Sequence, residues 1–187
     1  MLRVALISGS TRAASTNTAA LRTVEALAPP DLTASLYSGL SELPAFTPDA
    51  DDERPHPAVA RLRAELGAAD AVLFCTPEYA GTLPGSFKNL LDWTVGTGEL
   101  YEKPVAWINV AIEGRGGGAE ATLRTVLHYV SARVVEPACR RILVKRDSVD
   151  PDGLIDDPDV RRALADVLER LATHLRTMPP DSLTPSV

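Results

Sequence analysis

The chain has 187 residues, of which 45% are hydrophobic and 24% are charged, and its formal net charge at pH 7 is −6. This length suits one domain with a substantial core, while the negative charge argues against general binding to nucleic acid or to an anionic membrane. No apolar stretch reaches the roughly 20 residues needed to cross a bilayer, and the chain runs from Met1 directly into a strand-like segment without a signal-peptide pattern. We therefore expect a cytoplasmic protein whose partners are small molecules.

Strand-like and helix-like segments alternate along almost the whole chain. The predicted strands are residues 2–7, 32–37, 70–75, 104–110 and 134–144, the last interrupted near Pro137. The predicted helices, which repeat apolar residues at three- and four-residue spacing, are residues 18–27, 57–66, 86–95, 119–130 and 158–177. This pattern is typical of an α/β fold, a doubly wound sheet of five parallel strands with helices on both faces.

Two segments fall outside this alternation. Residues 39–55 combine prolines with acidic residues, so we interpret them as a surface loop in which the charge is solvated rather than ordered around a metal. Residues 178–187 contain three prolines and no periodicity, which predicts a disordered tail after a single domain of residues 1–177.

The sequence offers no pattern of metal-ligating or disulfide-forming residues. Cys75 and Cys139 are the only cysteines, and we interpret each as a buried apolar side chain rather than a redox group. The histidines, His56, His128 and His174, are far apart and lack ligand spacing. We predict no metal site.

Residues 8–17, Ser-Gly-Ser-Thr-Arg-Ala-Ala-Ser-Thr-Asn, lie between the first predicted strand and the first predicted helix. Ser10, Ser15 and Asn17 supply hydrogen-bond partners, and Arg12 supplies a planar charged fork suited to phosphate. A helix that begins near Asn17 would aim its free N–H groups at the same point. We interpret the segment as a phosphate-binding turn, with a loop that only caps the helix as the alternative.

Residues 76–93 follow the third predicted strand and read Thr-Pro-Glu-Tyr-Ala-Gly-Thr-Leu-Pro-Gly-Ser-Phe-Lys-Asn-Leu-Leu-Asp-Trp. Together the two segments resemble the NADPH-dependent FMN reductase family of flavodoxin-like proteins. Its members carry a Gly-Ser-x-Arg-x-x-Ser-x-Asn turn and a Pro-Glu-Tyr…Pro-Gly…Lys-Asn…Asp-Trp segment. The positions that fit are 9, 10, 12, 15 and 17 in the first pattern, and 77–79, 84, 85, 88, 89, 92 and 93 in the second. Two long motifs at the expected separation are a specific signal, and the resemblance covers about residues 2–177.

The resemblance implies a flavodoxin-like sheet of strand order 2-1-3-4-5. In such a sheet the ligand lies outside the carboxyl ends of the first and third strands, where both segments are expected. A Gly-x-Gly-x-x-Gly dinucleotide fingerprint is absent, because Gly9 is followed by Ser10 and Thr11.

The resemblance also implies which residues bind FMN. The phosphate would be held by Ser10, Arg12, Ser15, Thr16 and Asn17. The edge of the isoalloxazine would lie along the main chain of Pro77, Glu78, Tyr79, Ala80 and Gly81. For two of these side chains a simpler interpretation stays open, surface packing for Tyr79 and a solvated loop acid for Glu78.

A third loop, residues 111–118, follows the fourth predicted strand and has four glycines in five positions, which implies backbone close to another group. We expect Glu113 and Gly114 to contribute to cofactor binding there. Arg115 is interpreted either as a solvent-facing residue or as a ligand of the flavin or of the NADPH phosphates. Family members commonly have Ser-Pro-Gly-Gly around here and Asn at the position of Ala80, so this chain departs from the pattern at 80 and at 111–113.

The segment of residues 85–96 carries an apolar face that includes Phe87, Leu90, Leu91 and Trp93. Core packing and a subunit interface are both open interpretations of Trp93. The resemblance implies a homodimer, or a dimer of dimers, in which this helix helps to form the interface. An exposed Trp93 would suit such an interface. Lys88 and Asp92 stand four residues apart and are expected to pair.

The function that follows is an FMN-dependent NAD(P)H oxidoreductase. It would pass hydride from NADPH, or from NADH, through FMN to a small acceptor such as a flavin, a quinone, an azo compound or a metal oxyanion. No catalytic side chain is predicted, because the cofactor carries the chemistry. The alternatives are a non-enzymatic electron carrier of the flavodoxin type and a phosphate-ligand binding domain without flavin.

Overall fold

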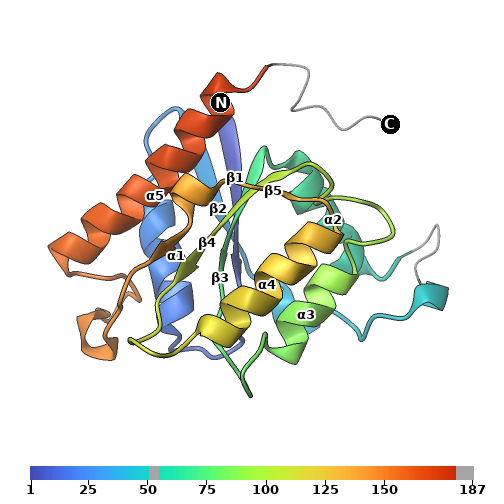
Figure 1. The fold of residues 1–187 in the computed structure, drawn as a ribbon, viewed down its shortest axis with the longest axis horizontal. Helices are drawn as coiled ribbons and strands as arrows, with labels where there is room; N and C mark the ends of the chain where they lie inside the picture. Colours follow the sequence, from blue (N-terminus) through green and yellow to red (C-terminus); the bar gives the residue numbers. More distant parts are fainter. Residues whose placement is uncertain (51–54, 180–187) are drawn as a thin grey trace.

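The computed structural model describes residues 1–50 and 55–179 (Figure 1). Its parallel sheet has the strand order β2-β1-β3-β4-β5, and β6 pairs with β4 beyond the end of β5. The strands are β1 (Leu2–Ser8), β2 (Leu32–Tyr37), β3 (Ala71–Cys75), β4 (Pro104–Asn109), β5 (Arg133–Val134) and β6 (Arg140–Arg141). The predicted order 2-1-3-4-5 is confirmed.

The last predicted strand is divided in two. A 3-10 turn at Glu136–Ala138 separates β5 from β6, and both short strands pair with β4. Pro137 lies inside that turn and has no N–H to donate to a ladder, which accounts for the interruption that the sequence predicts.

Helices cover both faces of the sheet. They are α1 (Thr16–Ala26), α2 (Pro57–Ala68), α3 (Gly85–Asp92), α4 (Gly117–Tyr129) and α5 (Pro158–Thr177). Figure 1 shows α1 and α5 on one face and α2, α3 and α4 on the other, and one hydrophobic cluster lies under each layer. The side chains of β3 and β4 are buried throughout, because strands covered on both faces carry continuous apolar runs rather than alternation.

Trp93 belongs to the core of this chain, so of the two interpretations left open for it core packing is confirmed and an exposed interface position is wrong. Its side chain is 1% exposed, its Nε1 donates to the Pro44 carbonyl at 2.9 Å, and the ring of Phe46 meets it edge-on at 5.0 Å. Helix α3 ends at Asp92, three residues earlier than predicted. The expected pair of Lys88 with Asp92 is confirmed at 2.6 Å.

The segment that begins at Gly39 is more ordered than the surface loop that the sequence predicts. It contains 3-10 helices at Leu40–Glu42 and Pro48–Ala50, and Leu40 is buried. Asn89 on α3 accepts from the N–H of Phe46 at 2.8 Å and donates to Pro44, so this segment is docked on α3. The acids among residues 51–54 lie outside the described residues.

Most of the predicted tail, from residue 180 onward, also lies outside the described residues. Met178, which directly follows α5, packs against the core. Within residues 1–50 and 55–179, no helix combines the length and apolar character that a bilayer span requires. In the same part of the chain, no group of three or more His, Cys, Asp or Glu residues is placed to hold a metal ion.

Candidate functional site

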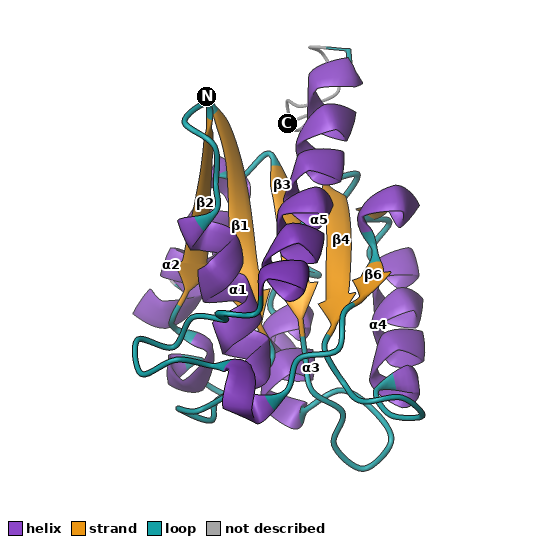
Figure 2. Ribbon diagram, turned by 90° about the vertical axis from the view of Figure 1, so that its left-hand side faces the viewer, coloured by secondary structure: helices purple, strands orange, loops and turns teal. Residues whose placement is uncertain are grey.

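Three loops meet at the carboxyl ends of β1, β3 and β4, the edge to which the strand arrows point in Figure 2. The N–H of Gly9 donates to the carbonyl of Cys75 at 2.9 Å, and a Cβ at Gly9 would overlap Thr76. A Cβ at Gly118 would likewise overlap the carbonyl oxygen of Gly81. The turn after β1, the loop after β3 and the start of α4 are therefore in direct contact, at the switch point where open α/β sheets bind their ligands.

The turn after β1 is shaped by its own hydroxyl groups. Ser8 Oγ accepts from the N–H of Ser10, and Ser10 Oγ accepts from the N–H of Arg12, each at 3.3 Å. Residues 11–14 are exposed. Within the described residues, the backbone N–H groups of residues 13–16 donate to no protein acceptor, and the first turn of α1 carries no acid. Free donors, the helix N-terminus and the exposed Arg12 fit a phosphate group.

Ser15 and Asn17 use their side chains inside the protein. Ser15 is 4% exposed and caps α1, its hydroxyl accepting from the N–H of Thr18 at 3.4 Å. Asn17 is 7% exposed, and its Oδ1 accepts from the Cys75 thiol at 3.4 Å. These two side chains therefore link the turn to α1 and to β3 by hydrogen bonds. Burial raises the pKa of the Cys75 thiol, so the thiol stays protonated and can donate to Asn17.

Cavities lie beside this turn. One, of about 260 Å³, has no acidic residue in its lining, which includes Ser10, Arg12, Arg22, Ser38 and Ser41. The other, of about 420 Å³, lies between α1 and the chain before α5, with Thr16, Arg22, Arg146, Asp150 and Gly153 among its lining residues. The surroundings of the turn therefore hold arginine and hydroxyl groups that can bind anions.

The loop after β3 is a tight reversal. Tyr79 and Thr82 exchange backbone hydrogen bonds of 3.0 and 3.1 Å, and both central residues have positive φ, 50° at Ala80 and 76° at Gly81. Such a turn favours Gly and Asn at its centre, which gives a backbone reason for the family's Asn where this chain has Ala80. Tyr79 is 52% exposed.

Glu78 is not a solvated loop acid. Its Oε2 accepts from the N–H of Gly118 at 2.6 Å and from the N–H of Ala119 at 3.3 Å, so its carboxylate caps the N-terminus of α4. The sequence carries no signal for this contact, because the partners are 40 residues apart.

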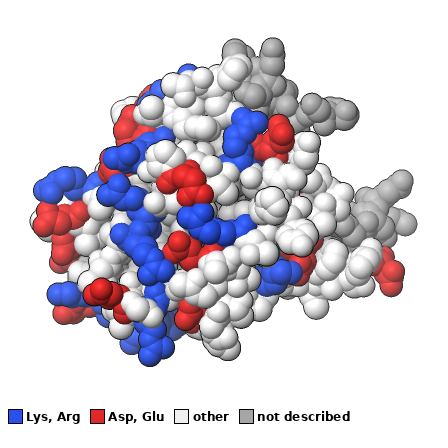
Figure 3. Space-filling view, in the orientation of Figure 1, with Lys and Arg blue, Asp and Glu red and all other residues white. Residues whose placement is uncertain are grey.

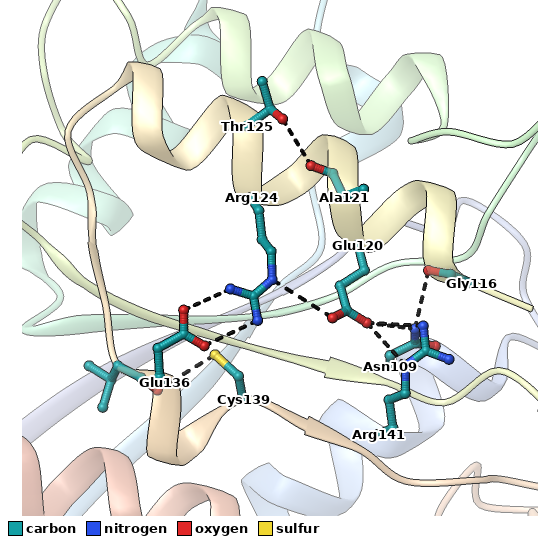
Figure 4. Close-up of polar contacts among 10 residues, drawn as sticks. Asn109, Gly116, Glu120, Ala121, Arg124, Thr125, Glu136, Cys139 and Arg141 are labelled. Atoms are coloured by element: carbon teal, nitrogen blue, oxygen red, sulfur yellow. Dashed lines mark hydrogen bonds and ion pairs between the residues drawn. The ribbon is translucent and has the colours of Figure 1, made fainter.

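The loop after β4 is closed at its base by Asn109, which is 5% exposed. Its Oδ1 accepts from the N–H of Ala111 at 3.1 Å. Its Nδ2 donates to the carbonyl of Gly116 at 3.2 Å (Figure 4). Glu113, Gly114 and Arg115 are exposed at the tip. The four glycines predict backbone close to another group, and at Gly116 that group is the Asn109 amide, which lies 2.6 Å from the position of a Cβ.

A parallel sheet of order 2-1-3-4-5 with a phosphate-type turn after β1 defines the class of flavodoxin-like proteins. The family model for NADPH-dependent FMN reductase matches residues 2–140, and the chain belongs to this family. The predicted family and fold class are confirmed.

Individual relatives agree with this membership. The chain is 33% identical over 181 residues to the NAD(P)H-dependent FMN reductase of Pseudomonas aeruginosa, covering 95% of this chain and 97% of that one. It is 31% identical over 157 residues to a quinone reductase of Escherichia coli K12, covering 80% and 82%. The solved structure of FerB, a flavoenzyme NAD(P)H:(acceptor) oxidoreductase from Paracoccus denitrificans, superposes with a TM-score of 0.80 at 27% identity, covering 94% of this chain and 98% of FerB.

This chain is therefore an FMN-dependent NAD(P)H oxidoreductase. The enzyme interpretation is favoured over the electron carrier and over the flavin-free binding domain.

Proposed function

We propose that the chain passes hydride from NADPH through FMN to a quinone or a flavin. The convergence of the three loops on one edge of the sheet carries this proposal. FMN, when bound, supplies the hydride-accepting and electron-donating chemistry. The protein binds and orients the reactants and needs no acid or base of its own.

The free N–H groups of residues 13–16 and the guanidinium of Arg12 support the assignment of this turn to the FMN phosphate. The proposed phosphate ligands are Ser10, Arg12, Ser15, Thr16 and Asn17. The proposed contacts of the flavin ring are the main chain of Pro77, Glu78, Tyr79, Ala80 and Gly81, with Glu113 and Gly114 on the opposite loop.

Arg115 is the proposed ligand of the NADPH phosphates. It is exposed at the tip of the loop after β4, and in the described residues no acidic side chain lies within ion-pair distance of it. An unpaired guanidinium beside the crevice is free to bind the 2′-phosphate, which supports NADPH over NADH as reductant. A quinone as acceptor is supported by the quinone reductase relative.

A homodimer, or a dimer of dimers, in the cytoplasm is part of the proposal. Trp93 is buried and does not support a dimer interface. Three other large hydrophobic side chains are exposed and available for an interface: Val95 (59% exposed), Tyr101 (64%) and Tyr129 (83%). The N–H of Glu102 donates to Ser131 at 2.9 Å, so the segments that hold Tyr101 and Tyr129 lie side by side. Light scattering at micromolar concentration tests the assembly, and a monomer mass with flavin bound and full activity would remove it from the proposal.

The test of the reaction combines spectroscopy and kinetics. Purified protein mixed with FMN and desalted should keep a flavin absorbance spectrum. Without oxygen, it should oxidise one equivalent of NADPH by reducing its bound flavin, and it should turn over further NADPH only when a quinone or a free flavin is added. Protein that stays colourless after mixing would overturn the proposal. Since both substrates would use one open flavin face, initial-rate plots at several quinone concentrations should give parallel lines, and intersecting lines would exclude a shared face.

A further inference from the structure

Arg141, which none of the sequence motifs includes, contacts the loop after β4 from β6. Its Nη1 donates to the carbonyl of Arg115 at 3.2 Å, and its Nε donates to Glu120 Oε2 at 3.1 Å. The same Glu120 oxygen accepts from Asn109 Nδ2 at 3.3 Å. Figure 4 shows Arg141, Glu120 and Asn109 converging below the start of α4. The base of the loop is thus held by one network from three elements, β4, α4 and β6.

These contacts restrain the backbone of Arg115 on both sides. Its N–H donates to the carbonyl of Ile112 at 3.0 Å, and its carbonyl accepts from Arg141. The following residue, Gly116, is buried and its carbonyl accepts from Asn109. With the peptide groups on both sides fixed, the Cα–Cβ direction of Arg115 is fixed too, although its guanidinium stays exposed.

Electrostatics favours the same arrangement. Glu120 pairs with Arg141 at 3.1 Å and with Arg124 at 3.8 Å, and Arg124 also pairs with Glu136 at 2.7 Å. Figure 3 shows this face with positive and negative side chains interleaved between α4 and α5. Because the charge of Arg141 is engaged by Glu120, Arg141 can contact the Arg115 carbonyl without competing for an anion at the loop tip.

We propose that Arg141 is a positioning residue for the nicotinamide dinucleotide: by holding the Arg115 carbonyl it presents the Arg115 guanidinium to the phosphates of NADPH. The inference rests on the proposed function and adds to it the residue that prepares the dinucleotide site. Such preorganisation lowers the ordering cost of binding, so its loss should appear in the binding of NADPH rather than in the rate at saturation.

The adjacent Arg140 provides a matched control. Arg140 and Arg141 are successive residues of β6, opposite Ile108 and Asn109 of β4, so their side chains point to opposite faces of the sheet. Arg140 pairs with Asp166 of α5 at 3.6 Å. Arg140→Met therefore removes an equal charge from the same short strand without touching the loop.

The experiment compares Arg141→Met, Arg141→Lys and Arg140→Met in the FMN-loaded enzyme. Arg141→Met should raise KM for NADPH and the Kd for NADP⁺ by about three- to tenfold, the range expected for one lost hydrogen bond. The value of kcat at saturation and the affinity for FMN should stay within about twofold of wild type. Arg141→Lys keeps the charge beside Glu120 and should recover part of the loss, and Arg140→Met should change neither constant.

Two further measurements separate positioning from a general loss of structure. In the flavin-free chain, amide hydrogen exchange of a peptide covering residues 110–117 should accelerate in Arg141→Met while peptides from β1 and α1 keep their rates. In a double-mutant cycle, Arg115→Ala should raise KM for NADPH in the wild-type background. In the Arg141→Met background it should raise KM little further, because Arg141→Met has already disrupted the interaction that Arg115→Ala removes.

Additive effects of the two substitutions would overturn the inference, as would an unchanged KM and Kd in Arg141→Met with the wild-type effect of Arg115→Ala intact. An Arg115→Ala variant with wild-type KM for NADPH would remove the phosphate role of Arg115 and this inference with it. A wild-type protein that binds no FMN would instead refute the proposed function itself, so the two failures are distinguishable.

Discussion

The carboxylate of Glu78 accepts a hydrogen bond of 2.6 Å from the backbone N–H of Gly118, which joins the loop after β3 to the first turn of α4. The loop and the helix are in such close contact that a side chain at position 118 would overlap the carbonyl of Gly81. Two of the three loops that form the candidate site are thus held together by protein contacts alone.

Glu78→Gln should lower the free energy of unfolding by about 0.5–2 kcal/mol, because the amide is a weaker acceptor at a helix N-terminus and carries no charge for the helix dipole. Urea unfolding followed by circular dichroism measures this. Asp147→Asn, at an exposed acid that does not contact the loop after β3 or α4, serves as the control for loss of charge. Equal stabilities for Glu78→Gln and wild type would show that the cap contributes nothing.

Gly118→Ala should destabilise the protein by about 1–3 kcal/mol, because the added methyl group forces α4 away from the Gly81 carbonyl. Gly117→Ala is the matched control, since the nearest atom to a Cβ there is Arg141 Nη2 at 3.7 Å. In the first turn of a helix, Ala should be neutral or stabilising relative to Gly. Thermal unfolding of both variants tests this contact, and similar melting temperatures for Gly117→Ala and Gly118→Ala would contradict the close approach of α4 to Gly81.

Ala80→Asn should stabilise the chain by about 0.5–1 kcal/mol, because Ala80 has a φ of 50° and Asn adopts this left-handed conformation more readily than Ala. Ala80→Gly should act in the same direction, offset by the entropy of the unfolded chain. Denaturant midpoints of the two variants provide the measurement. A loss of stability in both would mean that the turn after β3 does not have this geometry.

Arg12→Ala should weaken FMN binding by about 1.5–3 kcal/mol, the usual loss for a hydrogen bond to a charged group. Quenching of flavin fluorescence gives the dissociation constant. Riboflavin lacks the phosphate, so its affinity should be about equal in wild type and variant. An equal loss for riboflavin would place the phosphate elsewhere.

Both thiols should be unreactive in the folded protein. Burial raises the pKa of the Cys75 thiol, and it raises that of Cys139 to about 12. An unfolded thiol ionises near pH 8.5, so protonated thiols favour the folded chain, and stability should fall as pH rises from about 8.5 toward 12. Labelling with iodoacetamide at pH 8 should be slow in buffer and fast in urea. Cys75 is buried as predicted, whereas Cys139 is only half-buried. Rapid labelling of Cys75 in buffer would contradict its burial, and rapid labelling of Cys139 would contradict its raised pKa.

Within the candidate site, the sequence alone predicted the turn after β1. The hydrogen bonds inside the turn explain why it is predictable. Ser8, Ser10 and Ser15 accept from N–H groups two or three residues away, so the turn is determined by neighbours in the chain. The segment at residues 76–84 was located from its contiguous Pro-Glu-Tyr…Pro-Gly motif directly after the third predicted strand. Its relation to α4 was not, because Glu78 and Gly118 come together only when β3 and β4 pair.

By itself, then, the sequence determined the alternation of strands and helices, the family and the edge of the sheet at which the three loops meet. Each of these depends on local periodicity or on a contiguous motif. The tertiary structure alone decided that Trp93 is buried under Pro44, that the carboxylate of Glu78 caps α4 and that Arg141 holds the loop of Arg115. The partners in these contacts are 49, 40 and 26 residues apart. Such contacts form only after the sheet and its helix layers are packed, so no local sequence pattern predicts them.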